Sequence, residues 1–119
     1  MGQAVSAAIL QAKLWYYQRT SAMVLALCVA IHLIIIYIAV QDGLTANEIL
    51  GRTRGDWGFA LFYEIFVLAC FVHAPIGLAN ILRENIQNAF LNRALPLLLA
   101  ALILILGSMA VVGVVWGQP

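Results

Sequence analysis

The stretch TSAMVLALCVAIHLIIIYIAV, residues 20–40, decides the fold of this chain. It contains no Asp, Glu, Lys or Arg, and it reaches the ~20 apolar residues that a helix needs to cross ~30 Å of hydrocarbon. Its one histidine, His32, lies near the middle. A ring nitrogen in hydrocarbon is costly without a partner, so an intramembrane histidine indicates a functional site. The stretch therefore predicts a membrane-spanning helix with a candidate functional residue inside it.

Two further apolar runs follow, at about 58–82 and about 94–116. The first of these holds the other histidine, His73, and one acid, Glu64, near its start. Over its 119 residues the chain is 65% hydrophobic and 9% charged, whereas soluble domains are about 45–50% apolar and about 25% charged. We therefore expect an all-α membrane protein, a single membrane-anchor domain (residues 1–119) with three transmembrane helices.

We expect residues 1–19 to form a cytoplasmic segment, in which Ser6 to Gln18 make a short interfacial helix on the membrane surface. Orientation follows from the basic residues, which are Lys13 and Arg19 before the first span, Arg52 and Arg54 in the next connection, and Arg83 and Arg93 before the third span. Positive residues favour the cytoplasmic side, so the pattern places the N-terminus in the cytoplasm. These residues sit singly or in pairs, so nucleic acid is not an expected partner. The charged connection from 42 to 56 is expected to be a solvated loop.

Depth along the helices suggests a common role for the two histidines. With a rise of ~1.5 Å per residue, His32 lies about 20 Å from Arg19 and His73 about 15 Å from Arg83. Both are mid-membrane, on different spans, as axial ligands of a haem would be. Either both imidazoles bind one iron or each serves a separate haem. Gly77, one turn from His73, would leave room for the edge of a macrocycle.

Two short segments carry a family resemblance. Arg19-Thr20-Ser21-Ala22 resembles the Arg-x-Ser-Gly signature of the cytochrome b membrane anchor of succinate dehydrogenase and fumarate reductase. His73-Ala74-Pro75-Ile76-Gly77-Leu78, followed by Glu84, resembles that family's His-x-x-x-Gly-Ile-Arg segment and later Asp. The resemblance implies that His73 is an axial ligand of haem b and that Ser21 and Arg19 line a quinone site.

The chain departs from the family pattern at three positions. Ala79 stands where the family has arginine, so Arg83, one turn further on, is expected to take the place beside the haem propionates. Ala22 replaces a glycine. His32 has no counterpart in single-haem members and resembles the first-helix histidine of two-haem members, so it is a second candidate iron ligand.

The resemblance implies a subunit of a larger haem-binding helix bundle in a bacterial or archaeal cytoplasmic membrane. It would carry electrons between an iron–sulfur subunit and quinone, beside a flavoprotein subunit and a second membrane-anchor chain. Succinate chemistry would belong to the flavoprotein, not to this chain. The alternatives are a b-type cytochrome subunit of another respiratory dehydrogenase and a haem-free structural membrane anchor.

Glu64 also bears on a rival class, the small multidrug-type transporters, which bind protons and cations at a central membrane carboxylate. Glu64 is too near the end of its span for that role. We expect it at the outer interface beside Tyr63, with a proton path as the alternative.

Overall fold

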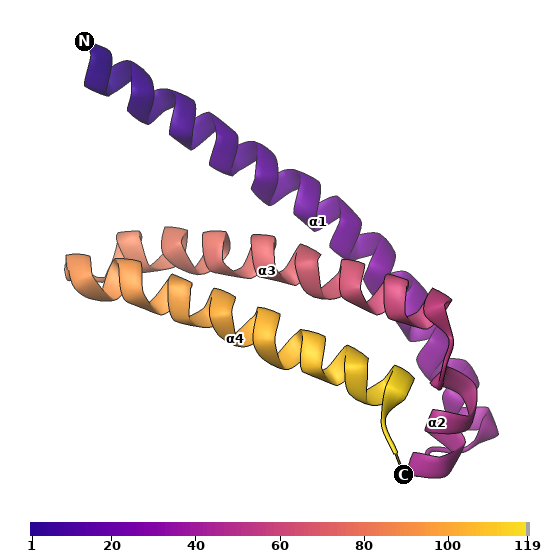
Figure 1. The fold of residues 1–119 in the computed structure, drawn as a ribbon. Coiled ribbons are helices and arrows are strands. Elements are labelled where there is room, and N and C mark those ends of the chain that lie inside the picture. Colours follow the sequence, from indigo (N-terminus) through magenta and orange to yellow (C-terminus); the bar gives the residue numbers. More distant parts are fainter. Residues whose placement is uncertain (119) are drawn as a thin grey trace.

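The computed structural model describes residues 1–118, and within them the chain folds into four helices. These are α1 (Gly2–Asp42), α2 (Ala46–Thr53), α3 (Trp57–Asn85) and α4 (Ala89–Trp116). The three long helices are apolar and long enough to cross a membrane, as expected of a multi-pass membrane protein. Helix α3 lies between α1 and α4 (Figure 1) and packs against both of them. The three predicted spans are therefore confirmed as helices.

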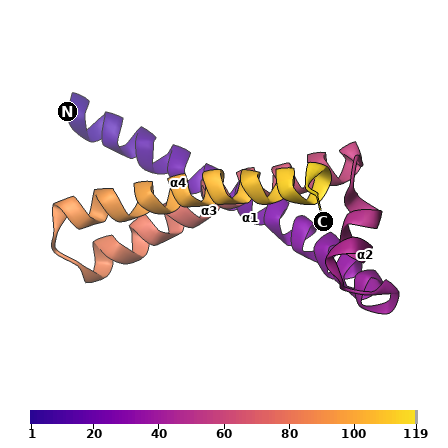
Figure 2. The same ribbon diagram turned by 60° about the horizontal axis from the view of Figure 1, so that its bottom comes forward.

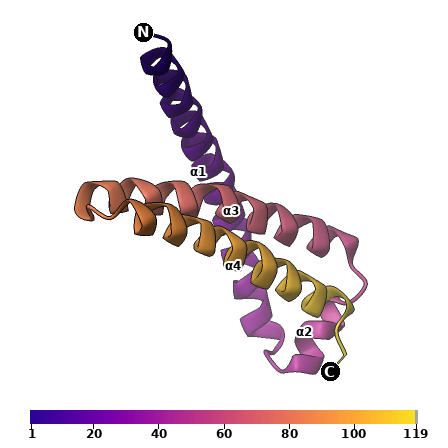
Figure 3. The same ribbon diagram turned by 60° about the vertical axis from the view of Figure 1, so that its left-hand side comes forward.

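Helix α1 is one continuous helix of 41 residues, about 60 Å long at ~1.5 Å per residue. Its N-terminal part diverges from the α3–α4 pair (Figures 1 and 3). The expected separate interfacial helix, Ser6–Gln18, is instead part of α1. The physical reason is local, because this segment is rich in Ala, Leu and Gln and contains neither Gly nor Pro, so the helical hydrogen bonds run on without a break.

Helices α3 and α4 form an antiparallel hairpin through the short connection at residues 86–88. We call this end of the molecule the hairpin end. Asn88 starts α4 by accepting hydrogen bonds from the backbone N–H groups of Phe90 and Leu91. The opposite end, where α2 lies, is called the α2 end. Asp56 starts α3 there in the same way, and the small buried core of Ala60, Val111 and Val115 joins α3 to α4 close by.

The connection between the first two spans is more ordered than the expected solvated loop. Thr45 and Glu48 form a reciprocal capping box that starts α2, and this is the reason that a helix forms in a charged segment. The Thr53 hydroxyl donates to the carbonyl of Val114, and the Gly55 N–H donates to that of Val115 at 2.8 Å. Helix α2 thus lies against the C-terminal end of α4 (Figure 2) and satisfies backbone carbonyls that α4 leaves unpaired.

Candidate functional site

His73 on α3 is held by two groups of α1. Its Nδ1 lies 3.3 Å from the Ser21 hydroxyl oxygen and 3.3 Å from the backbone carbonyl oxygen of Gln18. Ser21 is buried, and its hydroxyl donates to the Tyr17 carbonyl at 2.6 Å. Because the Ser21 hydroxyl hydrogen is used in that bond, the Ser21 oxygen acts as an acceptor toward His73. The Gln18 carbonyl oxygen can only accept. Two acceptors around Nδ1 put the ring proton on Nδ1 and leave the lone pair on Nε2.

His32 on α1 is held from the other direction, by aromatic side chains of α3. Its Nδ1 lies 3.2 Å from the Tyr63 hydroxyl. The ring meets Tyr63 and Phe66 edge to face, at centroid separations of 5.7 and 5.6 Å. A tyrosine hydroxyl both donates and accepts, so this contact orients the imidazole and leaves either tautomer available.

The two imidazoles lie at different levels of the molecule. His73 is level with Ser21, and His32 is level with Tyr63. Ser21 to His32 spans about 16 Å along α1, and Tyr63 to His73 about 15 Å along α3, at ~1.5 Å per residue. Metal–imidazole bonds are about 2 Å long, as for zinc, so two ligands of one metal ion stand only about 4 Å apart. Of the two arrangements that the sequence left open, one iron held by both histidines of a single chain is therefore excluded.

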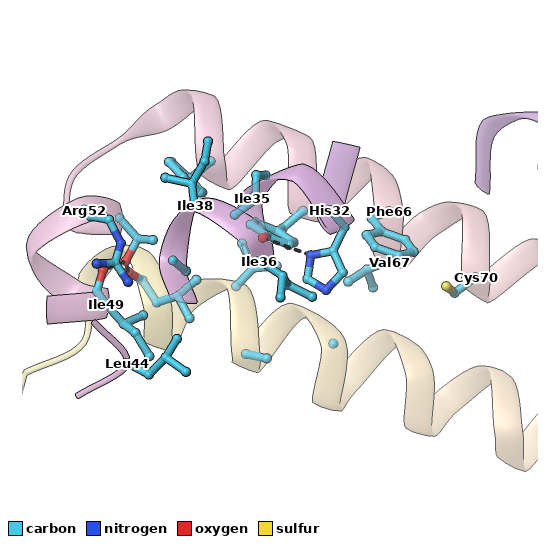
Figure 4. A pocket seen from close by; sticks show the side chains of 18 of the residues that line it. His32, Ile35, Ile36, Ile38, Leu44, Ile49, Arg52, Phe66, Val67 and Cys70 are labelled. Carbon is cyan, nitrogen blue, oxygen red and sulfur yellow. Dashed lines mark hydrogen bonds between the residues drawn. The ribbon is translucent and has the colours of Figure 1, made fainter. Parts of the chain in front are cut away.

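An apolar groove of about 810 Å³ lies beside His32, between α1, α3 and α4. Figure 4 shows the His32 ring in it, with Nδ1 toward the Tyr63 hydroxyl and the second nitrogen pointing into the groove. The lining is almost wholly aliphatic and aromatic, and Arg52 closes it at the α2 end. A largely apolar cavity with a few placed polar groups is typical of a small-molecule or cofactor site. His73 does not line this groove.

The other predicted site residues lie on the same helices but are not gathered around one point. Gly77 faces α1, where a Cβ would lie 3.2 Å from the side-chain nitrogen of Gln18, so the Gln18 amide fills the space beside it. The Arg19 guanidinium stacks over the Trp15 ring at 5.1 Å. Arg83 is exposed and bonds within α3, to the Ala79 carbonyl and the Asn80 side chain. Only Ser21 is in direct contact with His73.

Sequence reasoning missed three residues that the structure brings to the histidines, Gln18, Tyr63 and Phe66. The sequence alone suggested that Tyr63 is an aromatic residue at the membrane interface and that Gln18 belongs to a helix on the membrane surface. The sequence alone gave no signal for Tyr63, because the register that brings His32 level with Tyr63 is set by contacts between α1 and α3 such as that of Ser21 with His73. The side-chain oxygen of Gln18 is buried without a hydrogen-bond partner among residues 1–118, so this polar position beside His73 has unused acceptor capacity.

The fold and the site together define a helical chain with three candidate membrane spans and a histidine anchored at each of two levels. Comparisons with protein-family models, with curated proteins and with solved structures found no match.

Proposed function

We propose that this chain is a haem b-binding membrane anchor subunit of a succinate:quinone oxidoreductase-like complex, where it carries electrons between an iron–sulfur subunit and quinone. The observation that carries the proposal is the hydrogen bonding of His73. Metal-ligating histidines almost always donate their other ring N–H to a carbonyl, carboxylate or water, which orients the ring and raises its basicity. His73 meets this requirement through Gln18 and Ser21.

The residues at His32 also fit a flat apolar group. The groove has an apolar wall, an imidazole nitrogen directed into it, and the cation of Arg52 at one end. Arg52 would pair with the carboxylates of such a group, while its guanidinium also donates to the Gly43 carbonyl at 2.7 Å. A bound haem supplies one-electron transfer, with a potential set by axial ligand, burial and nearby hydrogen bonds.

Because the two imidazoles stand about 15 Å apart along the bundle, the proposal takes a two-haem form. His73 and His32 would each hold one haem, and a second membrane-anchor chain would supply the remaining ligands. Each imidazole is oriented by its own contacts with the neighbouring helix, His73 by Ser21 and Gln18 and His32 by Tyr63. Haem binding to one histidine therefore does not require the other to move.

The quinone site belongs beside Arg19 and Ser21, close to the level of His73. Arg19 is exposed on α1, so its guanidinium can turn from Trp15 to donate to a quinone carbonyl as negative charge develops there. Ser21 is buried and bonded to His73, so it couples the quinone site to the iron ligand. Arg83 lies about 15 Å further along α3, toward the hairpin end. The diverging N-terminal part of α1 is then on the cytoplasmic side, where the iron–sulfur and flavoprotein subunits dock.

The test is the haem content of the purified membrane complex. We expect a b-type reduced-minus-oxidised spectrum that develops on adding succinate, and two haems per copy of this chain. His73→Ala and His32→Ala should each remove one haem. Co-purification of the iron–sulfur subunit checks that each variant still assembles.

Three outcomes contradict the proposal or part of it. The absence of a b-type signal from the wild-type complex would contradict the haem-binding function. Haem content that is unchanged in an assembled His73→Ala complex removes His73 as a ligand. A signal that formate or another donor reduces, and succinate does not, assigns the chain to a different respiratory dehydrogenase.

A further inference from the structure

Glu64 is a carboxylate inside a candidate membrane span, toward the end of α3 that carries Trp57. The Trp57 and Trp116 rings, 5.2 Å apart, pack edge to face at the α2 end of the hairpin. From these tryptophans, Glu64 lies about 10 Å further along α3 and Ser108 about 12 Å further along α4. The Ser108 hydroxyl donates to Glu64 Oε1 at 2.9 Å. The carboxylate therefore lies about two helical turns inside the aromatic pair, bonded across the α3–α4 contact.

The carboxylate also faces away from the groove. Tyr63, Phe66 and Val67 of α3 line the groove, whereas Glu64 and Ser108 do not. Glu64 is half-buried, and its neighbours along the same face of α3, Leu61 and Leu68, are 66% and 45% exposed. A carboxylate has two oxygens and room for about four hydrogen bonds. Within residues 1–118 its only side-chain partner is Ser108, so the remaining acceptor capacity faces whatever covers this surface.

Charged side chains within a membrane pair with one another or with backbone groups. The chain offers no cation at the level of Glu64. The nearest basic residue of α1, Arg19, lies close to the level of His73, about 14 Å further along α3, and the other five lie nearer the two ends of the molecule. His32 is near this level, but it lies on the groove side and is bonded to Tyr63. A second, parallel copy would bring the same residues to the same levels. The missing partner must therefore belong to a different chain.

We propose that the α3–α4 face around Glu64, flanked by Leu61 and Leu68, docks a transmembrane helix of another subunit that carries an Arg or Lys at the depth of Glu64. The basic side chain pairs with the carboxylate oxygen that Ser108 leaves free, and Ser108 holds Oε1 in place. This face is separate from both histidines, so the proposal stands or falls independently of haem binding.

The test places a photoreactive diazirine amino acid at Leu61 or Leu68 in the full-length chain, in membranes that contain its natural partners. Leu106 is the control, because it is 58% exposed and lies almost half a turn round α4 from Ser108. Irradiation is followed by mass spectrometry of the crosslinked peptides. We expect Leu61 and Leu68 to capture an apolar helix of another subunit, with an Arg or Lys within one turn of the crosslinked residue. Lipid adducts alone, a second copy of this chain, or a helix without a basic residue would each overturn the proposal.

A charge-specific variant completes the test. Glu64→Gln preserves the size of the side chain and an acceptor for Ser108 but removes the charge. It should lower the crosslink yield at Leu68 by about tenfold or more, as for loss of one member of a buried charge pair. Glu64→Arg combined with Glu at the captured basic position should restore the yield. If Glu64→Gln crosslinks like wild type and only quinol turnover falls, Glu64 serves a proton path and the docking proposal is wrong.

Discussion

Ser21 and His73, 52 positions apart in the chain, are joined across α1 and α3 by a contact of 3.3 Å between Oγ and Nδ1. Together with the His32–Tyr63 contact it sets the register of the two helices, and together with the Gln18 carbonyl it sets the tautomer of the His73 imidazole. The register brings His32 level with Tyr63, and the tautomer leaves Nε2 of His73 with a lone pair. A few polar contacts between two apolar helices therefore determine the geometry at both histidines.

The first prediction concerns Ser21. Ser21→Ala removes one of the two acceptors of the His73 ring proton, and the Gln18 carbonyl remains. If His73 holds a haem as proposed, the haem should stay bound but with affinity lowered by roughly tenfold, as for loss of a group that orients a metal ligand. The measurement is the rate of haem loss from the detergent-solubilised complex to an excess of apomyoglobin. Thr20→Ala is the matched control, and equal rates in the two variants would contradict the role of Ser21.

The second prediction compares two glycines of α4. A Cβ at Gly107 would lie 2.7 Å from Val67 Cγ1, whereas one at Gly113 would meet nothing within 4 Å. Gly107→Ala should separate α3 from α4 and destabilise the fold by about 1–3 kcal/mol, as overpacking does. Gly113→Ala should leave stability unchanged or raise it, because alanine favours a helix over glycine by up to about 1 kcal/mol. Thermal unfolding in detergent distinguishes the two variants. A Gly107→Ala variant more stable than Gly113→Ala would contradict the close approach of Gly107 to Val67.

The third prediction tests the attachment of α2 to α4. Thr53 is buried and its hydroxyl donates to the Val114 carbonyl at 2.5 Å. Thr53→Val keeps the shape but loses this bond, at a cost of about 1–2 kcal/mol. Hydrogen exchange of the Gly55 amide, which bonds to Val115, should then accelerate by roughly 5- to 30-fold. Arg54→Ala loses only an exposed bond to the Gly117 carbonyl and should change the rate little.

The fourth prediction is a pH dependence of α2. Hydrogen bonds from the Thr45 hydroxyl, and then from the Thr45 backbone N–H, hold the pKa of the Glu48 carboxyl below its ordinary value of 4.5. A lowered pKa in the folded state means that the carboxylate stabilises the capping box above about pH 4.5 and that this contribution is lost as the pH falls through the folded pKa. Amide exchange at the start of α2, corrected for intrinsic rates, should accelerate across that window.

Glu48→Gln is the control for this dependence. It keeps a hydrogen-bonding side chain without a titratable group, so its corrected exchange rates should not change as the pH falls through the same window. An equal acceleration in wild type and Glu48→Gln would show that another group governs the transition.

The sequence predicted the elements well but one connection poorly. The apolar runs at about 20–40, 58–82 and 94–116 lie within the three long helices, because the length of an uncharged run reports directly on its ability to span a membrane. The charged connection was expected to be a loop although Thr45 and Glu48 have the spacing of a capping box. The break expected after residue 19 is absent because no residue there interrupts the helix.

The candidate site was only partly predictable. Depth along each helix placed His32 and His73 in mid-span, and the family resemblance singled out Ser21. The partners Gln18, Tyr63 and Ser108 were not, because each is a single polar residue on another helix. Glu64 shows the difficulty, since nothing in its own segment indicates that Ser108 lies opposite it.

By itself, the sequence determined that the chain forms three long apolar helices and that each of two of them carries one histidine at depth. These properties depend on local hydrophobicity and on the fixed rise of a helix. Only the tertiary structure decided that the imidazoles lie at separate levels, His73 against Ser21 and His32 against Tyr63. The physical reason is that apolar helices pack in many rotations and registers with similar buried area, so a few interhelical hydrogen bonds select one arrangement.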